Sequence, residues 1–275
     1  MKLAVVCATA RANGLDRLTS SLQQSVDGLY AIAELDAVST LPKGWRRVPF
    51  VPPPWYCPEM ALNVGADQAF ADGHDAVLFL ADLVWFDPGA VALAKRYLAS
   101  TLAPVLSGVV CWHDTYESQC DPGKLAPDLN NMVHNIGPGA GENIETLKQL
   151  RPLAGPVAAR AHLIYFICTV VRRDVWDAVN GIDERFSGAH SFFDTNFARR
   201  VEKVFGPCHL HTGFVAHRLN YTTNALLAPK KKLWGDQRNA LLEQRLWDWE
   251  VRYGRTRAVR SYCGAETPFP KEDPL

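Results

Sequence analysis

The chain has 275 residues, of which 48% are hydrophobic and 21% charged, and this suits one large α/β domain or one domain with an appended tail. Its 29 basic and 29 acidic residues give a formal net charge of zero. A dedicated duplex-DNA binder usually carries a basic excess, because phosphate contacts dominate its affinity. The balance of charges therefore disfavours a duplex-DNA-binding protein, although it does not exclude a local basic patch.

Neither a targeting segment nor a membrane span is expected. The opening apolar run is interrupted by Arg11 and Asn13, too early for a secretory signal. No run of about 18 apolar residues is present, so we expect no transmembrane helix. The seven cysteines are widely spaced and contain no C-x-x-C pair. They indicate reduced thiols in a cytoplasmic protein, and their spacing is not that of a zinc site.

Strands and helices alternate along the first part of the chain. Short apolar runs predict strands at 3–8, 30–35, 47–51 (an edge strand in a proline-rich extended segment), 76–80 and 104–111. Apolar residues at helical spacing predict helices from Leu15 to Val26, from Pro58 to a stop at Gly73, and from Asp87 through Leu98. This alternation indicates a mostly parallel sheet flanked by helices.

The second half begins with a loop-rich segment. Residues 112–160 are rich in Gly, Pro, Asn and Asp, and a long segment of this kind in a compact domain is often functional. The elements predicted after it are a strand at 163–171, a helix at 174–179, a helix carrying Phe193, Phe197 and Val201, a short strand around Val215, and a helix with Leu242, Leu246, Trp249 and Tyr253 on one face. We therefore expect a core domain over 1–225, with an insertion at 112–160, and a C-terminal helical extension over 226–275.

Polar side chains follow several predicted strands. In an open parallel sheet, ligands bind beyond the carboxyl ends of the strands. The residues at these positions are Thr9, Arg11, Asp36, Asp82, Trp112, His113, Asp114 and His217. Spacing alone explains Asp82 equally well as a metal or ribose ligand and as a turn residue. It favours a turn role for Asp36 and a structural role for His217.

Asp194 stands near the start of a predicted helix, among Phe192, Phe193 and Phe197. A carboxylate among aromatic side chains can have a raised pKa, which suits a general base. An aspartate in the first turn of a helix also interacts favourably with the helix dipole. From the residues alone, the catalytic and the structural explanations are equally good.

Four stretches, taken in order, resemble glycosyltransferase family 2, whose members have the GT-A fold. The first is the opening strand with its loop, VVCATAR at 5–11. The second joins ALNVGA at 61–66 to VLFLADLVWFDP at 77–88, and is similar to the family's "RNxG, helix, FLDxD, xP". The third, VRRDVW at 171–176 with VNGIDERF at 179–186, resembles "RR … VGGFDExF". The fourth, FDTNFARR at 193–200, resembles "EDxDLxxR". The last two are the most specific.

This resemblance implies an α/β, Rossmann-like GT-A sheet and an inverting transfer of a sugar from a nucleotide-sugar donor, UDP-linked by family habit, to an acceptor hydroxyl. It implies that Asp194 is the catalytic base and that Asp82 and His217 bind a divalent cation, Mn²⁺ or Mg²⁺. The residues that would contact the donor are Thr9, Arg11, Asp36, Asn63, Gly65 and Asp82. The acceptor would be a saccharide, a lipid-linked saccharide or a modified polymer such as nucleic acid, bound near Trp112, His113 and Asp114.

The chain also departs from the family pattern. Ala81-Asp82-Leu83 keeps one acidic residue of three, and Phe193 and Leu62 replace the family's Glu and Arg. Positive charge on Arg11, Lys124, Arg172 or Arg218 could neutralise the leaving diphosphate in place of a metal. A second hypothesis is therefore a catalytically inactive nucleotide-sugar-binding module of the same fold. A nucleotidyltransferase ranks last, because the loop after the first strand is not glycine-rich.

Overall fold

The structure is a computed structural model that describes residues 1–9, 15–22, 25–33, 40–51, 58–113, 156–159, 161, 164–186, 192–219, 241–248, 258 and 260. Its strands are β1 (Leu3–Thr9), β2 (Gly28–Ala33), β3 (Arg46–Arg47), β4 (Ala76–Ala81), β5 (Val84–Phe86), β6 (Val105–His113), β7 (Pro156–Ala159), β8 (Cys168–Arg172) and β9 (Cys208–Leu219). Its helices are α1 (Asp16–Ser21), α2 (Pro58–Ala71), α3 (Ala90–Ser100), α6 (Arg173–Val179), α7 (Phe193–Phe205) and the 3₁₀ helix η4 (Glu184–Phe186).

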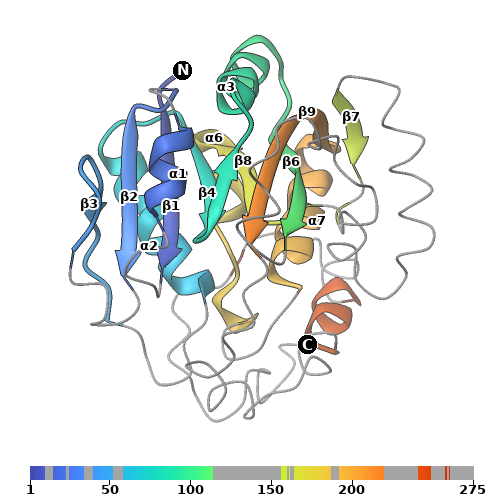
Figure 1. Ribbon diagram of the computed structural model, residues 1–275. Coiled ribbons are helices and arrows are strands. Elements are labelled where there is room, and N and C mark those ends of the chain that lie inside the picture. The colour runs from blue at the N-terminus through green and yellow to red at the C-terminus, as the bar shows by residue number, and fades with distance from the viewer. Residues whose placement is uncertain are drawn as a thin grey trace.

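The described strands form one sheet in the order β3-β2-β1-β4-β8-β6-β9-β5, with β7 paired to β9 beside β5. β1 pairs in parallel with β2 and β4, and β6 pairs in parallel with β9. β8 runs antiparallel between β4 and β6, so the sheet is mixed. The carboxyl ends of β1, β2, β4, β6 and β9 consequently share one edge, the lower edge in Figure 1. The predicted α/β sheet flanked by helices is confirmed.

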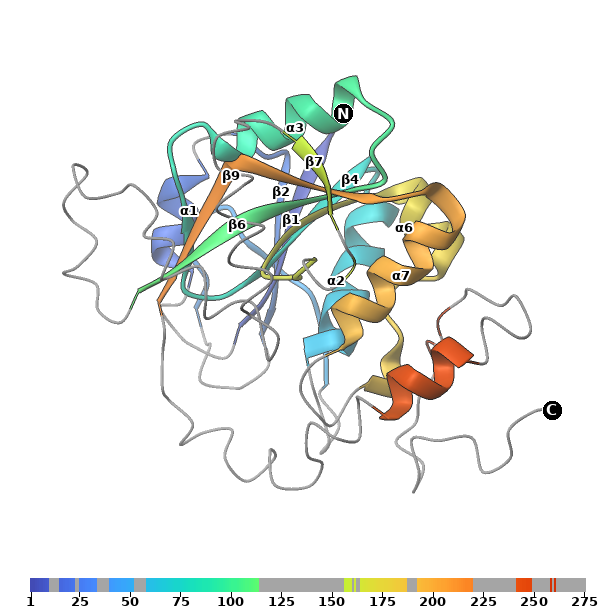
Figure 2. The same cartoon turned by 90° about the vertical axis from the view of Figure 1, so that its right-hand side faces the viewer.

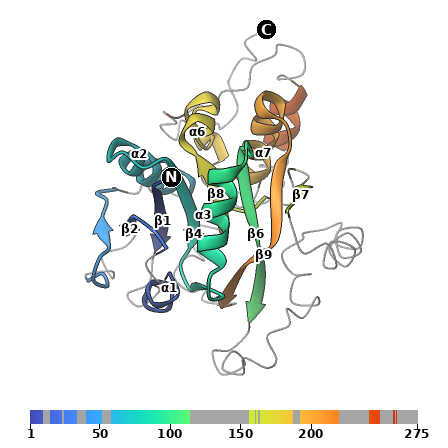
Figure 3. The ribbon, with the colours of Figure 1, turned by 90° about the horizontal axis from the view of Figure 1, so that it is seen from above.

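Helices cover both faces of the sheet. α1 and α3 lie on one face, and α2, α6 and α7 lie on the other (Figures 2 and 3). Beneath α6 and α7, Phe79 of β4 packs against Phe166 and Trp176, with ring centroids 4.8 and 5.1 Å apart. Gly65 brings α2 close to the sheet, because a Cβ there would lie 2.5 Å from side-chain atoms of both Val6 and Ile32. Buried apolar contacts of this kind are the main favourable term in folding.

The helix ends follow local sequence chemistry. α2 begins at Pro58, whose missing N–H suits the first turn, and Gly73 with φ of 87° lies just beyond its end. α6 is followed by Asn180 in the left-handed conformation, with φ of 62°. No helix in the described ranges combines the length and apolar character needed to cross a bilayer.

Several strands differ from the sequence-based expectation, among them β8, which begins at Cys168 rather than at 163. β5 follows directly after a turn at Leu83, which has φ of 62°, and pairs with β9. β7 falls inside the segment expected to be loop. β9 is 12 residues long rather than short, with a bulge where its register with β6 jumps from Gly108↔His211 to Val109↔Val215. The bulge interrupts the alternation of apolar residues that marks a strand in sequence.

The C-terminal region contributes a helix over residues 241–248, and this helix packs on the core. Leu242 and Leu246 are buried against Phe186, and Phe192 and Phe193 pack on the same cluster. The helix therefore lies next to the beginning of α7, as Figure 2 also shows. The described helix of the expected C-terminal extension over 226–275 thus packs on the core, while the boundary at 225 stays a prediction.

Candidate functional site

Thr9 and Asp82 meet at the carboxyl edge of the sheet. Thr9 is the last residue of β1 and Asp82 directly follows β4, and these strands are neighbours. The Thr9 hydroxyl donates a hydrogen bond of 3.2 Å to Oδ2 of Asp82, and both residues are buried. Leu83, next along, has φ of 62°, a region that costs a non-glycine residue free energy and that clusters at functional sites.

Asp194 lies in the first turn of α7, at the same edge of the sheet. Its Oδ1 accepts a hydrogen bond of 2.9 Å from the Thr195 N–H. The carboxylate therefore also satisfies one of the N–H groups that have no partner within the first turn of the helix. The pKa of Asp194 is raised to about 7, chiefly by burial and to a smaller extent by the nearby Glu243 carboxylate, against backbone N–H groups that lower it. A carboxyl with such a pKa is well matched to accepting a proton near neutral pH.

Aromatic rings fix the position of Asp194. Its neighbour Phe193 stacks on Phe166, with ring centroids 5.9 Å apart, and Phe166 packs edge-on against Phe79 of β4. Phe79 stands three residues before Asp82, so one chain of contacts links the two acidic residues. Burial, together with the Asp194 charge, raises the pKa of Tyr165 to about 12, which places this phenol close to the carboxylate. Phe192, two residues before Asp194, has φ of 72°.

His217 makes contacts within the sheet. It lies on β9 opposite Trp85 of β5, and the two rings stack with centroids 5.4 Å apart. His217 Nε2 lies 2.9 Å from Oδ1 of Asp87. Within the described ranges, no three His, Cys, Asp or Glu side chains gather closely enough to hold a metal ion. Asp82 and His217 therefore do not form a divalent-cation site with the described residues alone, and metal binding by this pair stays a prediction.

Asn63 and Gly65 face the interior of the protein. Asn63 is buried, and its amide donates to the Ile182 carbonyl and to Glu184 and accepts from the Ile182 N–H, each at 2.9 Å. These bonds join α2 to the turn after α6, as Gly65 joins α2 to the sheet. Both residues thus have a structural role, and the donor contact inferred for them from the resemblance stays a prediction.

Neither a family model nor a curated protein matches the chain. Solved structures do match. S. aureus TarS 1-349 in complex with UDP superposes with a TM-score of 0.54 and 11% identity, covering 88% of this chain and 65% of that one. The structure of TarS 1-349 alone superposes with a TM-score of 0.52 at 12% identity, covering 93% of this chain and 73% of that one. The structure of GalNAc-T7 with UDP, GalNAc and Mn²⁺ superposes with a TM-score of 0.56 at 11% identity, covering 81% of this chain and 44% of that one.

This chain has the GT-A fold. The fold expected from the four sequence stretches is thereby confirmed, at an identity too low to carry residue roles across. The chain spans about two thirds of the TarS fragment with UDP and less than half of the GalNAc-T7 chain. Thr9 and Asp82 lie at the carboxyl edge of the GT-A sheet, at the ends of β1 and β4. Asp194 lies at the beginning of α7, and His217 lies within β9.

The remaining candidates from the sequence fall at the carboxyl edge of the sheet, outside the described residues or, for Arg172, at the opposite edge. Trp112 and His113 end β6, where their backbone pairs with Arg218 and Leu219 of β9. Residues outside the described ranges are Arg11, Asp36, Asp114 and Lys124. Arg172 was a wrong candidate for neutralising the diphosphate. It pairs with Ala76 at the opposite edge of the sheet and forms an ion pair with Asp174.

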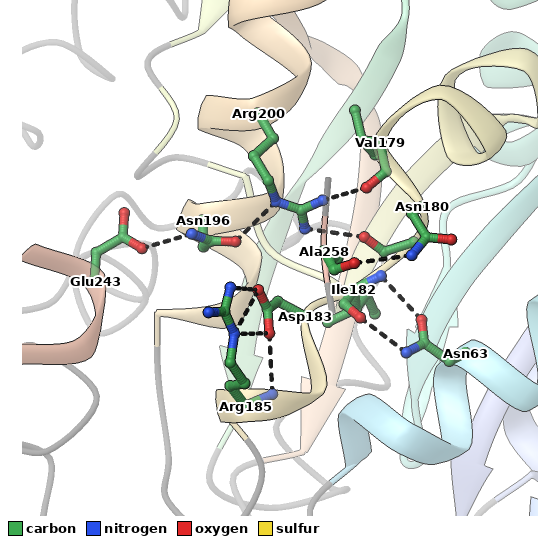
Figure 4. Close-up of polar contacts among 11 residues, drawn as sticks. Asn63, Val179, Asn180, Ile182, Asp183, Arg185, Asn196, Arg200, Glu243 and Ala258 are labelled. Carbon is green, nitrogen blue, oxygen red and sulfur yellow. Dashed lines mark hydrogen bonds and ion pairs between the residues drawn. The ribbon is translucent and has the colours of Figure 1, made fainter. Parts of the chain in front are cut away.

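Sequence reasoning missed a buried polar network that joins α7 to the end of α6 (Figure 4). Arg200, only 1% exposed, donates from Nε to Asn196 and from its two terminal nitrogens to the carbonyls of Val179 and Gly181, at 2.9, 2.6 and 2.9 Å. Asn196 in turn donates to Glu243 at 2.9 Å. The i, i+4 spacing of Asn196 and Arg200 was the available signal, but the partners are distant in sequence.

Proposed function

We propose that this chain is a divergent inverting glycosyltransferase that moves a sugar from a nucleotide-sugar donor, UDP-linked, to an acceptor hydroxyl, with Asp194 as general base. One observation carries the proposal: a carboxyl whose pKa burial raises to about 7 lies at the carboxyl edge of a GT-A sheet. Ligands of open α/β sheets bind at that edge. The UDP in the TarS and GalNAc-T7 structures supports the choice of donor.

The proposed reaction is a single in-line displacement at the anomeric carbon. The acceptor oxygen forms the new bond to this carbon while the bond from the carbon to the diphosphate oxygen breaks. The acceptor proton passes to Asp194, and the nucleoside diphosphate leaves with the bonding electron pair. Because the acceptor oxygen, held by the base, attacks the anomeric carbon on the face opposite to the leaving group, the configuration inverts. A hydroxyl is a weak nucleophile at neutral pH, so positioned proton transfer supplies much of the acceleration.

The donor side of the proposed site is built on Thr9 and Asp82. Their hydrogen bond holds the ends of β1 and β4 together where a ribose or diphosphate would lie. The negative charge that develops on the diphosphate needs neutralising in the transition state. Arg218, which is paired with Val84 and Trp112 by register at this edge, is a candidate for that role, alongside Arg11.

The proposal extends to acceptor and location. A saccharide, a lipid-linked saccharide or a modified polymer such as nucleic acid would enter near the end of β6, at Trp112 and His113. The buried side chains of Cys168 and Cys208 are thiols rather than disulfides in the described part of the chain, which supports the proposed cytoplasmic location.

The pH dependence of transfer tests the role of Asp194. The base acts as a carboxylate, so its active fraction rises with pH through its pKa of about 7. We expect kcat/KM, measured as nucleoside diphosphate released from UDP-linked sugars with an acceptor panel, to fall about tenfold per pH unit below 7. A kcat/KM that begins to fall only near pH 4, where an ordinary aspartate titrates, would contradict this role. Donor binding without release of product, at any pH and with every acceptor, would favour the inactive binding module.

A further inference from the structure

The helix over 241–248 lies against the segment that carries Asp194. Its buried residues Leu242 and Leu246 pack on Phe186 of η4, and Phe192 and Phe193 complete the cluster. Phe192 and Phe193 are the two residues that precede Asp194 in the chain. The apolar face of this helix therefore covers the backbone turn that leads into α7.

Polar contacts from the same helix reach the first two turns of α7. Glu243 is 4% exposed, and its Oε2 accepts the hydrogen bond from Asn196, two residues after Asp194. Its other oxygen forms an ion pair with Arg199. The Arg199 guanidinium also lies over the ring of Trp247, 5.1 Å from the ring centroid. Glu243 thus contacts two side chains of α7, Asn196 in the turn that follows Asp194 and the charged Arg199.

The contacts of Glu243 continue into the core. Asn196 receives a hydrogen bond from Arg200, and Arg200 is tied to the carbonyls at the end of α6 (Figure 4). A later part of the C-terminal region attaches there too, because Ala258 donates to the Val179 carbonyl at 3.0 Å and accepts from Asn180 at 2.8 Å. The rotation of α7 about its axis is therefore fixed by a network that runs from Glu243 to α6.

We propose that Glu243 is a positioning residue for Asp194: it holds the first turns of α7 in place and sets a negative charge beside the base. This inference rests on the proposed function. The ionisable groups that face Asp194 among the described residues are the phenol of Tyr165, before β8, and the carboxylate of Glu243, whose own charge is opposed by Arg199 and Arg200. Removing the Glu243 charge should therefore lower the pKa of Asp194, because like charges disfavour ionisation.

The first test needs no activity. The carboxyl of Asp194 is titrated by ¹³C NMR in protein labelled at aspartate, with the signal assigned by its loss in Asp194→Asn. In Glu243→Gln the amide oxygen can still accept from Asn196, so the main change is the lost charge. We expect the Asp194 titration to move to lower pH in Glu243→Gln and to stay at its wild-type position in Asp248→Asn, an exposed carboxylate on the same helix. An unchanged titration in Glu243→Gln would overturn the inference.

The second test measures transfer. Glu243→Ala removes the hydrogen bond and the ion pair, and we expect kcat to fall about 10- to 100-fold with little change in the donor KM, since small misplacement of a reacting group has effects of this size. Asp248→Asn should keep the wild-type kcat. Wild-type kcat in Glu243→Ala, with Asp194→Asn inactive, would overturn the inference and leave the proposed function standing. If the wild-type chain transfers no sugar, the proposed function fails, and the titration alone decides whether Glu243 is coupled to Asp194.

Discussion

Asp194→Asn is expected to lower kcat for sugar transfer by about 10²- to 10⁴-fold, the usual contribution of a positioned general base. Asparagine keeps the shape of the side chain and can still accept the hydrogen bond from the Thr195 N–H, but it cannot take a proton from the acceptor. Donor affinity should stay close to that of the wild-type protein, because Thr9 and Asp82 are untouched. The measurement is steady-state release of nucleoside diphosphate together with calorimetric titration of the donor.

Measuring the free energy of unfolding of Asp194→Asn distinguishes a loss of catalysis from a loss of folding. In the folded chain the pKa of Asp194 is about 7, above its ordinary 3.8, so ionising this group opposes folding. The cost is absent below about pH 4, grows as pH rises, and is complete above pH 7. A neutral asparagine avoids this cost, and the variant should be at least as stable as wild type at pH 8.

Asp177→Asn, an exposed substitution at the opposite edge of the sheet, is the matched control and should keep full activity. Wild-type kcat in Asp194→Asn would refute the base assignment.

Arg200→Leu is expected to lower the free energy of unfolding by about 3–5 kcal/mol. The substitution removes the Arg200 donor from two buried acceptors, on Gly181 and Asn196, and one of the two donors to the Val179 carbonyl, which keeps the Ala258 N–H. Each buried acceptor left without a partner costs about 1–3 kcal/mol. For a chain of this size the effect corresponds to a fall in Tm of about 10 °C. Denaturant unfolding and calorimetry measure it.

Arg173→Leu is the control for that substitution. Arg173 lies at the beginning of α6, the helix that ends at Val179, but its side chain is 52% exposed and its ion pair with Asp177, at 3.7 Å, is on the surface. Exposed ion pairs contribute about 0–1 kcal/mol. Equal stability losses in the two variants would mean that the buried network has no special role.

Much of the fold could be read from local patterns. The apolar runs of β1 and β4, and the helical spacing around α2, α3 and α7, gave elements close to those observed, because each buries a face with its own period. β5 was missed because its three residues follow a left-handed Leu83, a conformation that leucine does not signal. β9 was expected to be short because its bulge breaks the apolar alternation, and β7 lies in a segment whose composition is typical of loops.

The site was accessible to sequence reasoning only in part. Asp82 and Asp194 follow from strand-end and helix-start positions, and the structure places both at the carboxyl edge. Asn63 illustrates the limit, because a conspicuous amide in a motif-like stretch forms three internal hydrogen bonds that nothing local reveals. Glu243 lies 49 positions after Asp194 by numbering, and only the packing of the C-terminal helix brings it to α7.

Binding of a nucleotide-sugar is the most direct test of the account, and a thermal-shift screen of nucleotides and nucleotide sugars, with and without Mn²⁺, measures it. A ligand at about 100 times its Kd stabilises the native state by about 2.7 kcal/mol, which raises Tm by several degrees. We expect UDP and UDP-linked sugars to raise the Tm of the wild-type chain and to do so less in Asp82→Ala. No rise with any nucleotide, in the presence or absence of Mn²⁺, would contradict a donor site at the carboxyl edge of this sheet.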